Sequence, residues 1–445
     1  MRIVAVVALS LLVSVFAARS HAAPISVDFP PGLHVPAAAQ PGPGFDVDKA
    51  TAAYIAMLTP EQRARSDAYF EGGYWLQLWN WLYGVAVAAV VLFSGLSRRI
   101  REMAERVSRR PWLYTLIYAA VWTLVGFVLS LPFAIYAGFV REHAYGLSEQ
   151  PFLSWLGDHL KGLGVGVVLG SILVLAVYAA LRRAGARWWI WATGIVFVFN
   201  VVVGMIGPVF IAPIFNHYQP LPEGPVREAV LSLARANEIP TEHVEWFDAS
   251  KQTTRISANV SGMWGTTRLS LNDNLLKRTS LPEIEAVLGH EMGHYVLSHT
   301  LALTIYITIV FGVVFWISRF AFDRALARWG ARTGVRDRGD PAGLPLLVAI
   351  VTTLLFLATP VFNGITRNAE SQADAFGLNA AREPYGFAMV SMRLATYRKI
   401  VPGPVEELLF FDHPSGYERV HRSMIWLKEN QSPRYAEEAA QAAAK

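Results

Sequence analysis

The chain has 445 residues, of which 53% are hydrophobic and 16% are charged, whereas soluble proteins average about 25% charged residues. This composition predicts an integral membrane protein, and the modest net charge of +5 is attributed to loop arginines, so no nucleic-acid partner is expected. Because the chain has no cysteine, disulfides and thiolate metal sites are excluded, and any metal must be held by His, Asp or Glu.

The N-terminal region divides into two parts. Residues 1–23 combine an arginine, a short apolar core and small residues near the end, which is typical of a cleaved signal peptide. An uncleaved anchor helix is the alternative. Residues 24–73 contain many prolines and acidic residues and no long apolar run, so they are predicted to form a soluble segment.

Further stretches are long and apolar enough to cross a bilayer, which takes about 20 mostly apolar residues. Tryptophans lie near several of their ends, as expected at a membrane–water interface. They predict one membrane region over residues 74–214 and a second, with two helices, over residues 300–366. The stretches are 75–96, 113–138, 162–181, 188–214, 300–320 and 343–366.

Arginine distribution predicts which loops share one side of the membrane. Segments 97–110 and 182–187 hold six and three arginines, and segment 321–342 is also rich in arginine. By the positive-inside rule these loops face the cytoplasm. The long segments 215–299 and 367–445 then lie on the opposite side. We expect a multi-pass protein of a bacterial inner membrane.

Segment 215–299 has the pattern of a small α/β unit. Helical periodicity runs over residues 225–239, and two strand-like stretches follow at 243–250 and 265–273. Ser280 and Glu283 then stand at the spacing of a capping box, which predicts the start of a strong helix.

That helix carries the sequence HEMGH. His290 and His294 are one turn apart on the same face, and two imidazoles at this spacing can bind one zinc ion. Glu291 stands beside them and can act as general base on a water molecule. The segment is therefore predicted to contain the first part of a catalytic metal site.

A catalytic zinc needs a third protein ligand and an open position. Glu370, in the sequence RNAESQADAF just after the last predicted span, is the best candidate. Asp374, one turn later, is predicted to orient a metal-bound histidine. The predicted cofactor is one Zn²⁺ ion held by His290, His294 and Glu370.

Four sequences together resemble the type I CAAX prenyl endopeptidase family, the membrane zinc metalloproteases that include bacterial heat-shock relatives. The resemblance runs from about residue 62 to residue 428. It implies a mostly α fold, in which a multi-pass ring of transmembrane helices encloses a chamber and a small zincin-like α/β metalloprotease domain closes it. The sequences are HEMGH, AESQADAFG, ISANVSG (256–262) and DHPSGYERV (412–420).

The same resemblance implies further site residues. Asn259 would hold an extended substrate with its backbone and side chain, and His413 and Arg419 would stabilise the oxyanion of the tetrahedral intermediate. Family members that process prenylated proteins act on the cytosolic side, whereas the loop arginines here predict the opposite side. The expected partners are the lipid bilayer and a peptide or protein substrate, lipidated or not.

The leading hypothesis is a monomeric, integral-membrane zinc endopeptidase that cleaves membrane-associated or misfolded proteins with metal-activated water. An intramembrane protease of the site-2 type fits less well, because such enzymes bury this motif within an apolar span. A transporter-like or substrate-holding chamber with a structural zinc is the alternative from a different class. His299 is interpreted as an ordinary interfacial histidine.

Overall fold

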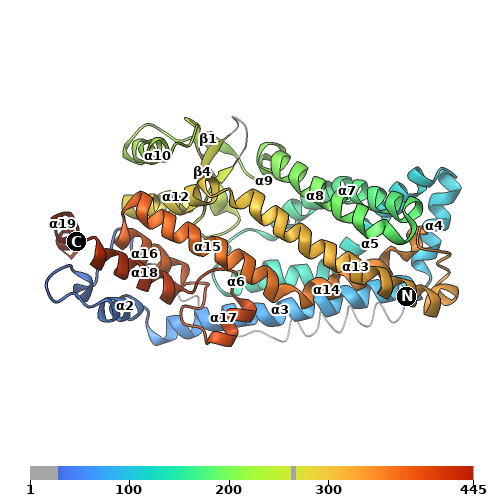
Figure 1. Ribbon diagram of the computed structural model, residues 1–445, viewed down its shortest axis with the longest axis horizontal. Coiled ribbons are helices and arrows are strands. Elements are labelled where there is room, and N and C mark those ends of the chain that lie inside the picture. Colours follow the sequence, from blue (N-terminus) through green and yellow to red (C-terminus); the bar gives the residue numbers. More distant parts are fainter. Residues whose placement is uncertain (1–28, 262–266, 444–445) are drawn as a thin grey trace.

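The computed structural model describes residues 29–261 and 267–443. The signal-peptide prediction for residues 1–23 lies outside this part of the chain. The molecule is elongated, with long helices along most of its length and a mixed α/β region at one end (Figure 1).

Long apolar helices account for every span predicted from the sequence. In the described part of the chain, five helices, or six if a pair bent by 53° counts as one span, are long and apolar enough to cross a membrane. The helices are longer than the predicted apolar stretches. Polar residues at the membrane surface continue each helix, and a search for apolar residues does not include them. The helices are α3 (Pro60–Phe93), α5 (Pro111–Ile135), α7 (Phe152–Arg183), α8 (Trp188–Ile206), α13 (His299–Thr333) and the bent pair α14 (Leu344–Leu357) and α15 (Thr359–Ala381).

These helices form a closed ring. Helix α3 packs on α5, α5 on α7, α7 on α8, α8 on α13, α13 on α14, and α14 again on α3. In the most apolar 18-residue stretch of each of the five single spans, only 6–17% of the residues are buried. A packed bundle would bury far more, so the ring is a single layer of helices. Short elements extend two spans: α6 (Arg141–Ala144) and α9 (Ala212–Phe215), which follow the π-helical turns Tyr136–Val140 and Gly207–Ile211.

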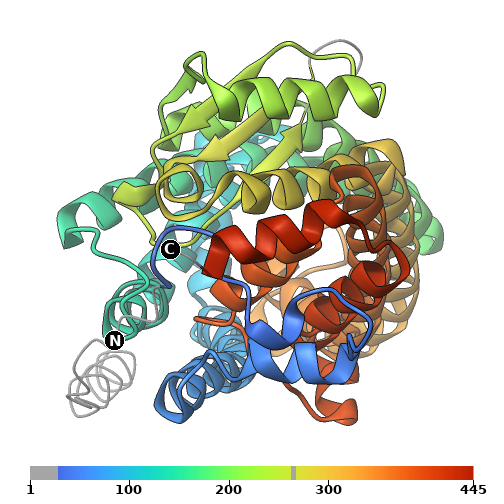
Figure 2. The same ribbon diagram turned by 90° about the vertical axis from the view of Figure 1, so that its left-hand side faces the viewer.

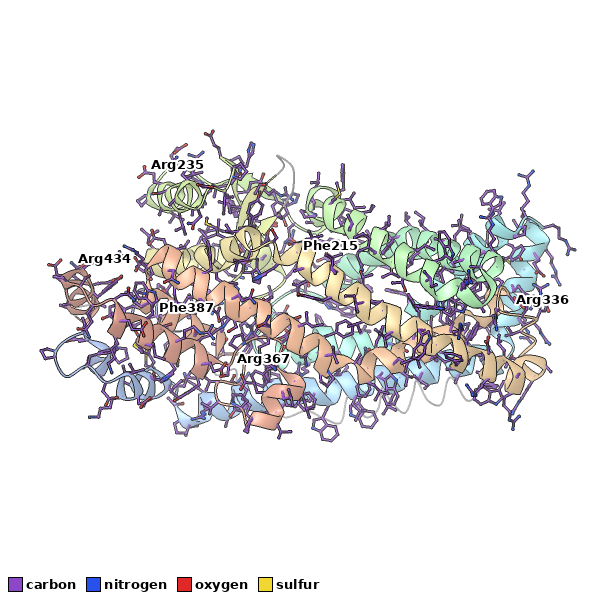
Figure 3. The ribbon with its side chains drawn as sticks, viewed as in Figure 1. Phe215, Arg235, Arg336, Arg367, Phe387 and Arg434 are labelled. Carbon is purple, nitrogen blue, oxygen red and sulfur yellow. The ribbon has the colours of Figure 1, made fainter. Side chains whose placement is uncertain are left out.

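The arginine-rich segments meet at one end of the molecule. Helix α4 (Leu96–Val107) lies there, and its Arg101 is only 6% exposed. Arg101 donates to the Asp340 carboxylate and, at 2.8 Å, to the carbonyl of Gly334. Figure 3 shows Arg336 at this end and Arg434 at the other. The predicted cytoplasmic loops are therefore one structural unit, far from the α/β region.

The α/β region is built on a four-stranded sheet with the order β1-β2-β4-β3. Strands β2 and β4 are parallel and the other pairs are antiparallel. Alternation in β4 sends Leu269 and Leu271 into a core, where they meet Leu288 and Met292. The predicted helix and the two predicted strands are present. The elements are β1 (Tyr218–Pro220), α10 (Pro225–Ala236), β2 (Val244–Phe247), β3 (Ala258–Ser261), β4 (Arg268–Asn272), α11 (Asp273–Arg278) and α12 (Leu281–Val296).

The N-terminal segment packs against the last helices of the chain, and the view from the α/β end shows this contact (Figure 2). Tyr54, Tyr385 and Met424 lie fully buried in their shared core. The sequence places segment boundaries at residues 73 and 366, but α3 and α15 continue through them without a break. Single helices therefore join the membrane ring to this end of the molecule. The elements are α2 (Val47–Ile55), α16 (Pro384–Leu394), α17 (Pro404–Phe410), α18 (Gly416–Glu429) and α19 (Pro433–Ala443).

Candidate active site

Helix α12 begins where the sequence predicts. The backbone nitrogen and the hydroxyl of Ser280 each donate to Glu283 Oε2 at 2.7 Å. Glu283 is fully buried and also pairs with Arg393, whose guanidinium donates to backbone carbonyls of residues 29, 30 and 32. The start of the helix is thus fixed by its own cap and by the N-terminal segment.

Helices α12 and α15 approach each other at glycines. A Cβ atom at Gly289 would lie 3.0 Å from the carbonyl oxygen of Gly377, and one at Gly293 would lie 3.1 Å from the Cα of Ala373. A Cβ atom at Gly377 would lie 2.7 Å from the backbone nitrogen of His290. The two glycines of α12 cost helix stability, but they allow the close contact that brings α15 over the histidines.

The three predicted ligands converge on one point. His290 Nε2 lies 3.2 Å from His294 Nε2 and 3.2 Å from Glu370 Oε2, and Glu370 Oε1 lies 3.4 Å from His294 Nε2. Ligand atoms bound at about 2.0–2.1 Å around a tetrahedral zinc are about 3.3–3.4 Å apart. The donor set and its spacing therefore fit one zinc ion. Among the described residues, this is the group of His and carboxylate side chains close enough to hold a metal.

Asp374 lies behind His290, where the sequence predicts it. Its Oδ1 is 2.8 Å from His290 Nδ1, and the side chain is fully buried. Arg419 Nε lies 3.0 Å from Asp374 Oδ2, and Arg419 Nη2 lies 3.2 Å from Glu370 Oε2. Although burial opposes a charged imidazole, the Asp374 and Glu370 carboxylates raise the pKa of His290 to about 9. The two carboxylates thus share one buried arginine.

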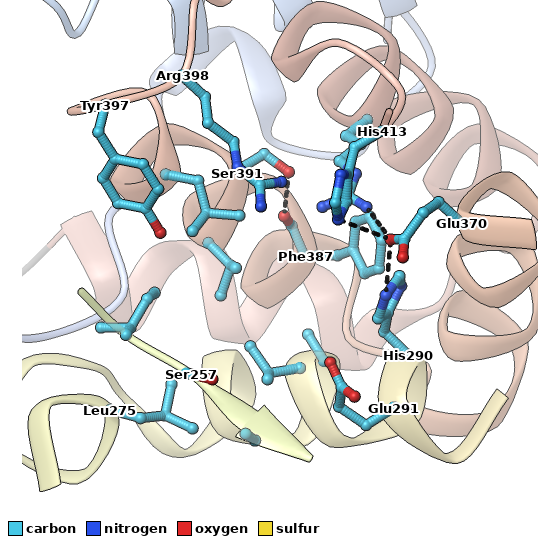
Figure 4. Close-up of a pocket in the computed structure, with 17 residues that line it drawn as sticks. Ser257, Leu275, His290, Glu291, Glu370, Phe387, Ser391, Tyr397, Arg398 and His413 are labelled. Atoms are coloured by element: carbon cyan, nitrogen blue, oxygen red, sulfur yellow. Dashed lines mark hydrogen bonds and ion pairs between the residues drawn. The ribbon is translucent and has the colours of Figure 1, made fainter. Parts of the chain in front are cut away.

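Glu291 and His413 line the same pocket as the metal donors (Figure 4). Burial raises the pKa of the Glu291 carboxyl above its ordinary value. His413 Nε2 lies 3.3 Å from Glu370 Oε2, and its Nδ1 lies 2.7 Å from Asp412 Oδ1. Burial lowers the pKa of His413, although Asp412 favours its charged form. Both predicted catalytic side chains therefore stand beside the proposed metal position.

Away from the metal donors, the pocket combines apolar side chains with the polar side chains of Ser391, Tyr397 and Arg398. Strand β3 and the residue before it form one wall, with Ser257 and Ala258, and helix α12 forms another (Figure 4). The apolar part of this lining suits an apolar side chain of a bound peptide. Its apolar lining comprises Ile256, Leu275, Ala286, Val287, Phe387, Val390 and Leu394.

Strand β3 is an edge strand, but Asn259 is oriented differently from what the resemblance implies. Among the described residues, β3 pairs only with β4, with Asn259 opposite Ser270. The backbone nitrogen of Asn272 donates to the carbonyl of Ser257 at 2.9 Å, so these two residues form a hydrogen-bonded pair. Such pairs recur at every second residue of an antiparallel ladder, so the backbone groups of Asn259 also point toward β4. The open edge is presented by the residues on either side of it, 258 and 260. The Asn259 side chain lies on the sheet face opposite buried Ala258.

His299 lies in the site, contrary to its interpretation from the sequence. It is only 4% exposed and is placed between His294 and Gln372. No sequence pattern indicates this contact, because it depends on a turn at Ser298, which has a φ of +55°. A left-handed conformation at a serine is uncommon and has no reliable sequence signal.

Comparison with known proteins identifies the family. Residues 48–217 match the family model described as CAAX prenyl protease N-terminal, five membrane helices, and residues 220–424 match the model for peptidase family M48. The chain belongs to peptidase family M48. It is therefore a membrane metalloendopeptidase, and helix α12, which is not among its membrane-capable helices, carries the motif outside the spans.

Relatives of this M48 peptidase match most of its length. An uncharacterized metalloprotease of Bacillus subtilis is 27% identical over 348 residues, covering 78% of this chain and 81% of that protein. A CAAX prenyl protease 1 homolog of Arabidopsis thaliana is 26% identical over 387 residues, covering 82% and 88%. The crystal structure of S. mikatae Ste24p aligns with a TM-score of 0.69 at 20% identity, covering 82% and 90%. The last match confirms the predicted fold.

Proposed function

We propose that this M48 peptidase is a zinc-dependent endopeptidase that cleaves membrane-associated or misfolded proteins. The observation that carries the proposal is the convergence of two imidazoles and one carboxylate at 3.2–3.4 Å, with Glu291 on the same pocket. His290, His294 and Glu370 hold the ion. When bound there, zinc supplies a Lewis acid that polarises a peptide carbonyl and activates water at neutral pH.

Glu291 acts as the general base and then as the general acid. It takes a proton from the attacking water and passes it to the nitrogen of the leaving amine, so the carboxylate is regenerated in each turnover. The buried setting of Glu291, which raises its pKa, suits a group that must both accept and release a proton near neutral pH. Asp374 holds His290 in the orientation that presents Nε2 to the metal.

His413 and Arg419 complete the site. His413 Nε2 faces the pocket beside Glu370, where an N–H donor can stabilise the oxyanion of the tetrahedral intermediate. Arg419 lines the same pocket, but its ion pairs to Glu370 and Asp374 give it a second task. It holds the two carboxylates in place and offsets their charge.

The substrate binds as an added strand. Extended peptides recognise an open sheet edge through backbone hydrogen bonds, and β3 offers such an edge beside α12. The apolar pocket takes a side chain next to the cleaved bond. Because relatives carry the name CAAX prenyl protease and the site adjoins a membrane ring, we place membrane-tethered peptides, lipidated or not, first among the substrates. All three ligands come from one chain, so the site needs no second copy, and a monomer is the expected state. The arginine-rich loops at one end agree with insertion in a bacterial inner membrane.

The first test compares Glu291→Gln with Glu370→Ala in purified protein. Glu291→Gln should keep zinc at wild-type stoichiometry and lose about 100–10,000-fold in hydrolysis of a quenched peptide, the range attributed to general acid–base catalysis. Glu370→Ala should lose both zinc and hydrolysis. Full hydrolysis by Glu291→Gln would rule out this mechanism. A wild-type protein that binds zinc but hydrolyses no peptide would favour the substrate-holding chamber.

A further inference from the structure

His294 has a buried partner that none of the proposed catalytic steps uses. His299 is the first residue of α13, and Gln372 lies on α15, two residues after Glu370. His299 Nδ1 lies 3.0 Å from His294 Nδ1, and His299 Nε2 lies 3.1 Å from Gln372 Oε1. Three side chains from three helices thus form one line that ends at the metal position.

The proton positions along this line follow from hydrogen-bond chemistry. A nitrogen that binds a metal must offer a lone pair, so a neutral His294 that binds through Nε2 carries its proton on Nδ1. That N–H can donate only if His299 Nδ1 accepts, which places the proton of His299 on Nε2. Gln372 Oε1 accepts that proton. Each donor has one acceptor, and every tautomer is fixed.

We propose that His299 and Gln372 are positioning residues that hold His294 in the tautomer and ring orientation of a metal ligand. The proposal rests on the zinc site proposed above. It assigns to His294 the kind of support that Asp374 gives to His290, because metal-bound histidines usually donate their second N–H to a fixed acceptor.

The two supports differ in charge, and the difference suits the site. Asp374 and Glu370 already place two carboxylates near the metal position, with Arg419 between them. A carboxylate behind His294 would add a further negative charge in a half-buried site, where an unpaired charge is costly. The neutral imidazole of His299, with the neutral amide of Gln372 next to it, accepts the hydrogen bond from His294 without adding a charge.

The backbone is shaped for this contact. Helix α12 ends at Val296 and α13 begins at His299, so the turn between them is very short. Ser298 adopts the left-handed conformation, with φ +55° and ψ +33°. Strained conformations persist where the surrounding structure holds them, often at functional sites. Here the turn directs the side chain of His299 back toward His294 instead of outward.

The test measures zinc affinity, by chelator competition, in purified full-length variants. His299→Phe removes the acceptor, and should weaken zinc binding by about 10–100-fold, as for other partners of metal-bound histidines. His299→Asn keeps an oxygen near the position of Nδ1 and should recover most of the affinity. Gln372→Leu removes the acceptor of the His299 N–H and should lose several-fold in zinc affinity.

Two controls separate positioning from packing. Thr300→Val changes the exposed neighbouring residue and should leave zinc affinity unchanged. The melting temperature of the metal-free protein reports on packing of the α12–α13 turn without the metal. Positioning predicts that His299→Phe and His299→Asn differ in zinc affinity while their metal-free melting temperatures are alike.

The possible failures are distinguishable. If the wild type binds zinc tightly and His299→Phe binds it equally well, the positioning role is wrong and the zinc site stands. If His299→Phe lowers the metal-free melting temperature and His299→Asn recovers no affinity, His299 is a packing residue. If the wild type itself binds no zinc, the proposed metal site fails, and the positioning role fails with it.

Discussion

At the scale of single residues, Arg419 is a cation that contacts both Glu370 and Asp374. It is 8% exposed and lies within 3.2 Å of both Glu370 and Asp374. Removing it takes the nearest arginine from two buried carboxylates and leaves Asp374 only the more distant Arg422, at 3.7 Å, which is destabilising for such groups. The resemblance implies one role for Arg419, in the transition state, whereas the contacts add a role in the ground state.

His413→Ala and Arg419→Ala should therefore differ in what they lose. His413→Ala should lower kcat by about 100–1,000-fold, the typical effect of losing an oxyanion donor, with zinc affinity unchanged. Arg419→Ala should lower both kcat and zinc affinity, because Glu370 and Asp374 lose their partner. Arg419→Lys should recover little, since a lysine cannot reproduce the two-sided contact of a guanidinium. Peptide hydrolysis and chelator competition on the same samples measure both quantities, and wild-type zinc affinity in Arg419→Ala would restrict Arg419 to the oxyanion.

At the scale of elements, the site depends on the distance between α12 and α15. The histidines are on one helix and the carboxylates on the other, and the backbones meet at Gly289, Gly293 and Gly377. Protein interiors are too closely packed to absorb an added methyl group without a shift. A small change in this crossing therefore moves Glu370 relative to the histidines.

Gly377→Ala should separate the two helices. Its Cβ would lie 2.7 Å from the backbone nitrogen of His290, and overpacking of this kind costs about 1–3 kcal/mol in stability. We expect weaker zinc binding and a lower melting temperature. Gly364→Ala is the matched control on the same helix, because nothing lies within 4 Å of its added Cβ. Equal zinc affinity in the two variants would show that the crossing does not set the ligand geometry.

The sequence predicted the parts of this region that depend on local patterns. The capping box at Ser280 and the spacing of His290 and His294 are visible within a few residues, and each apolar span is visible within one continuous stretch of about 20 residues. The crossing of α12 with α15 and the left-handed turn at Ser298 are not, because they depend on contacts between distant segments or on a rare backbone conformation. For that reason the sequence indicated the three candidate ligands that the structure brings together, and it missed His299.

At the scale of the whole molecule, the arginine-rich loops and the catalytic region lie at opposite ends of the helical ring (Figures 1 and 3). This arrangement agrees with a chain that crosses a membrane between them. The fold itself has no preferred side, since a ring with these ends could be inserted either way. The prediction of sidedness rests on the loop arginines alone.

Single cysteines in this cysteine-free chain measure the sidedness directly. Val107→Cys and Ala331→Cys report on the arginine-rich end, and Ser232→Cys reports on the α/β region; all three positions are exposed. An impermeant maleimide should label only Ser232→Cys in intact cells and all three after the membrane is permeabilised. Labelling of the first two and not of Ser232→Cys would place the active site in the cytoplasm.

The proposed metal ligands lie on α12 and α15, which α13 and α14 separate in the sequence, so they are synthesised at different times. The histidines emerge from the ribosome before α13 and α14, whereas Glu370, His413 and Arg419 emerge after them. A nascent chain that has stalled, or has failed to insert its last two spans, has the helix with the histidines but no third ligand beside it. With the proposed ligand set, such a chain lacks Glu370 beside the two histidines, so we expect no peptidase activity before the segment after the last span has been made.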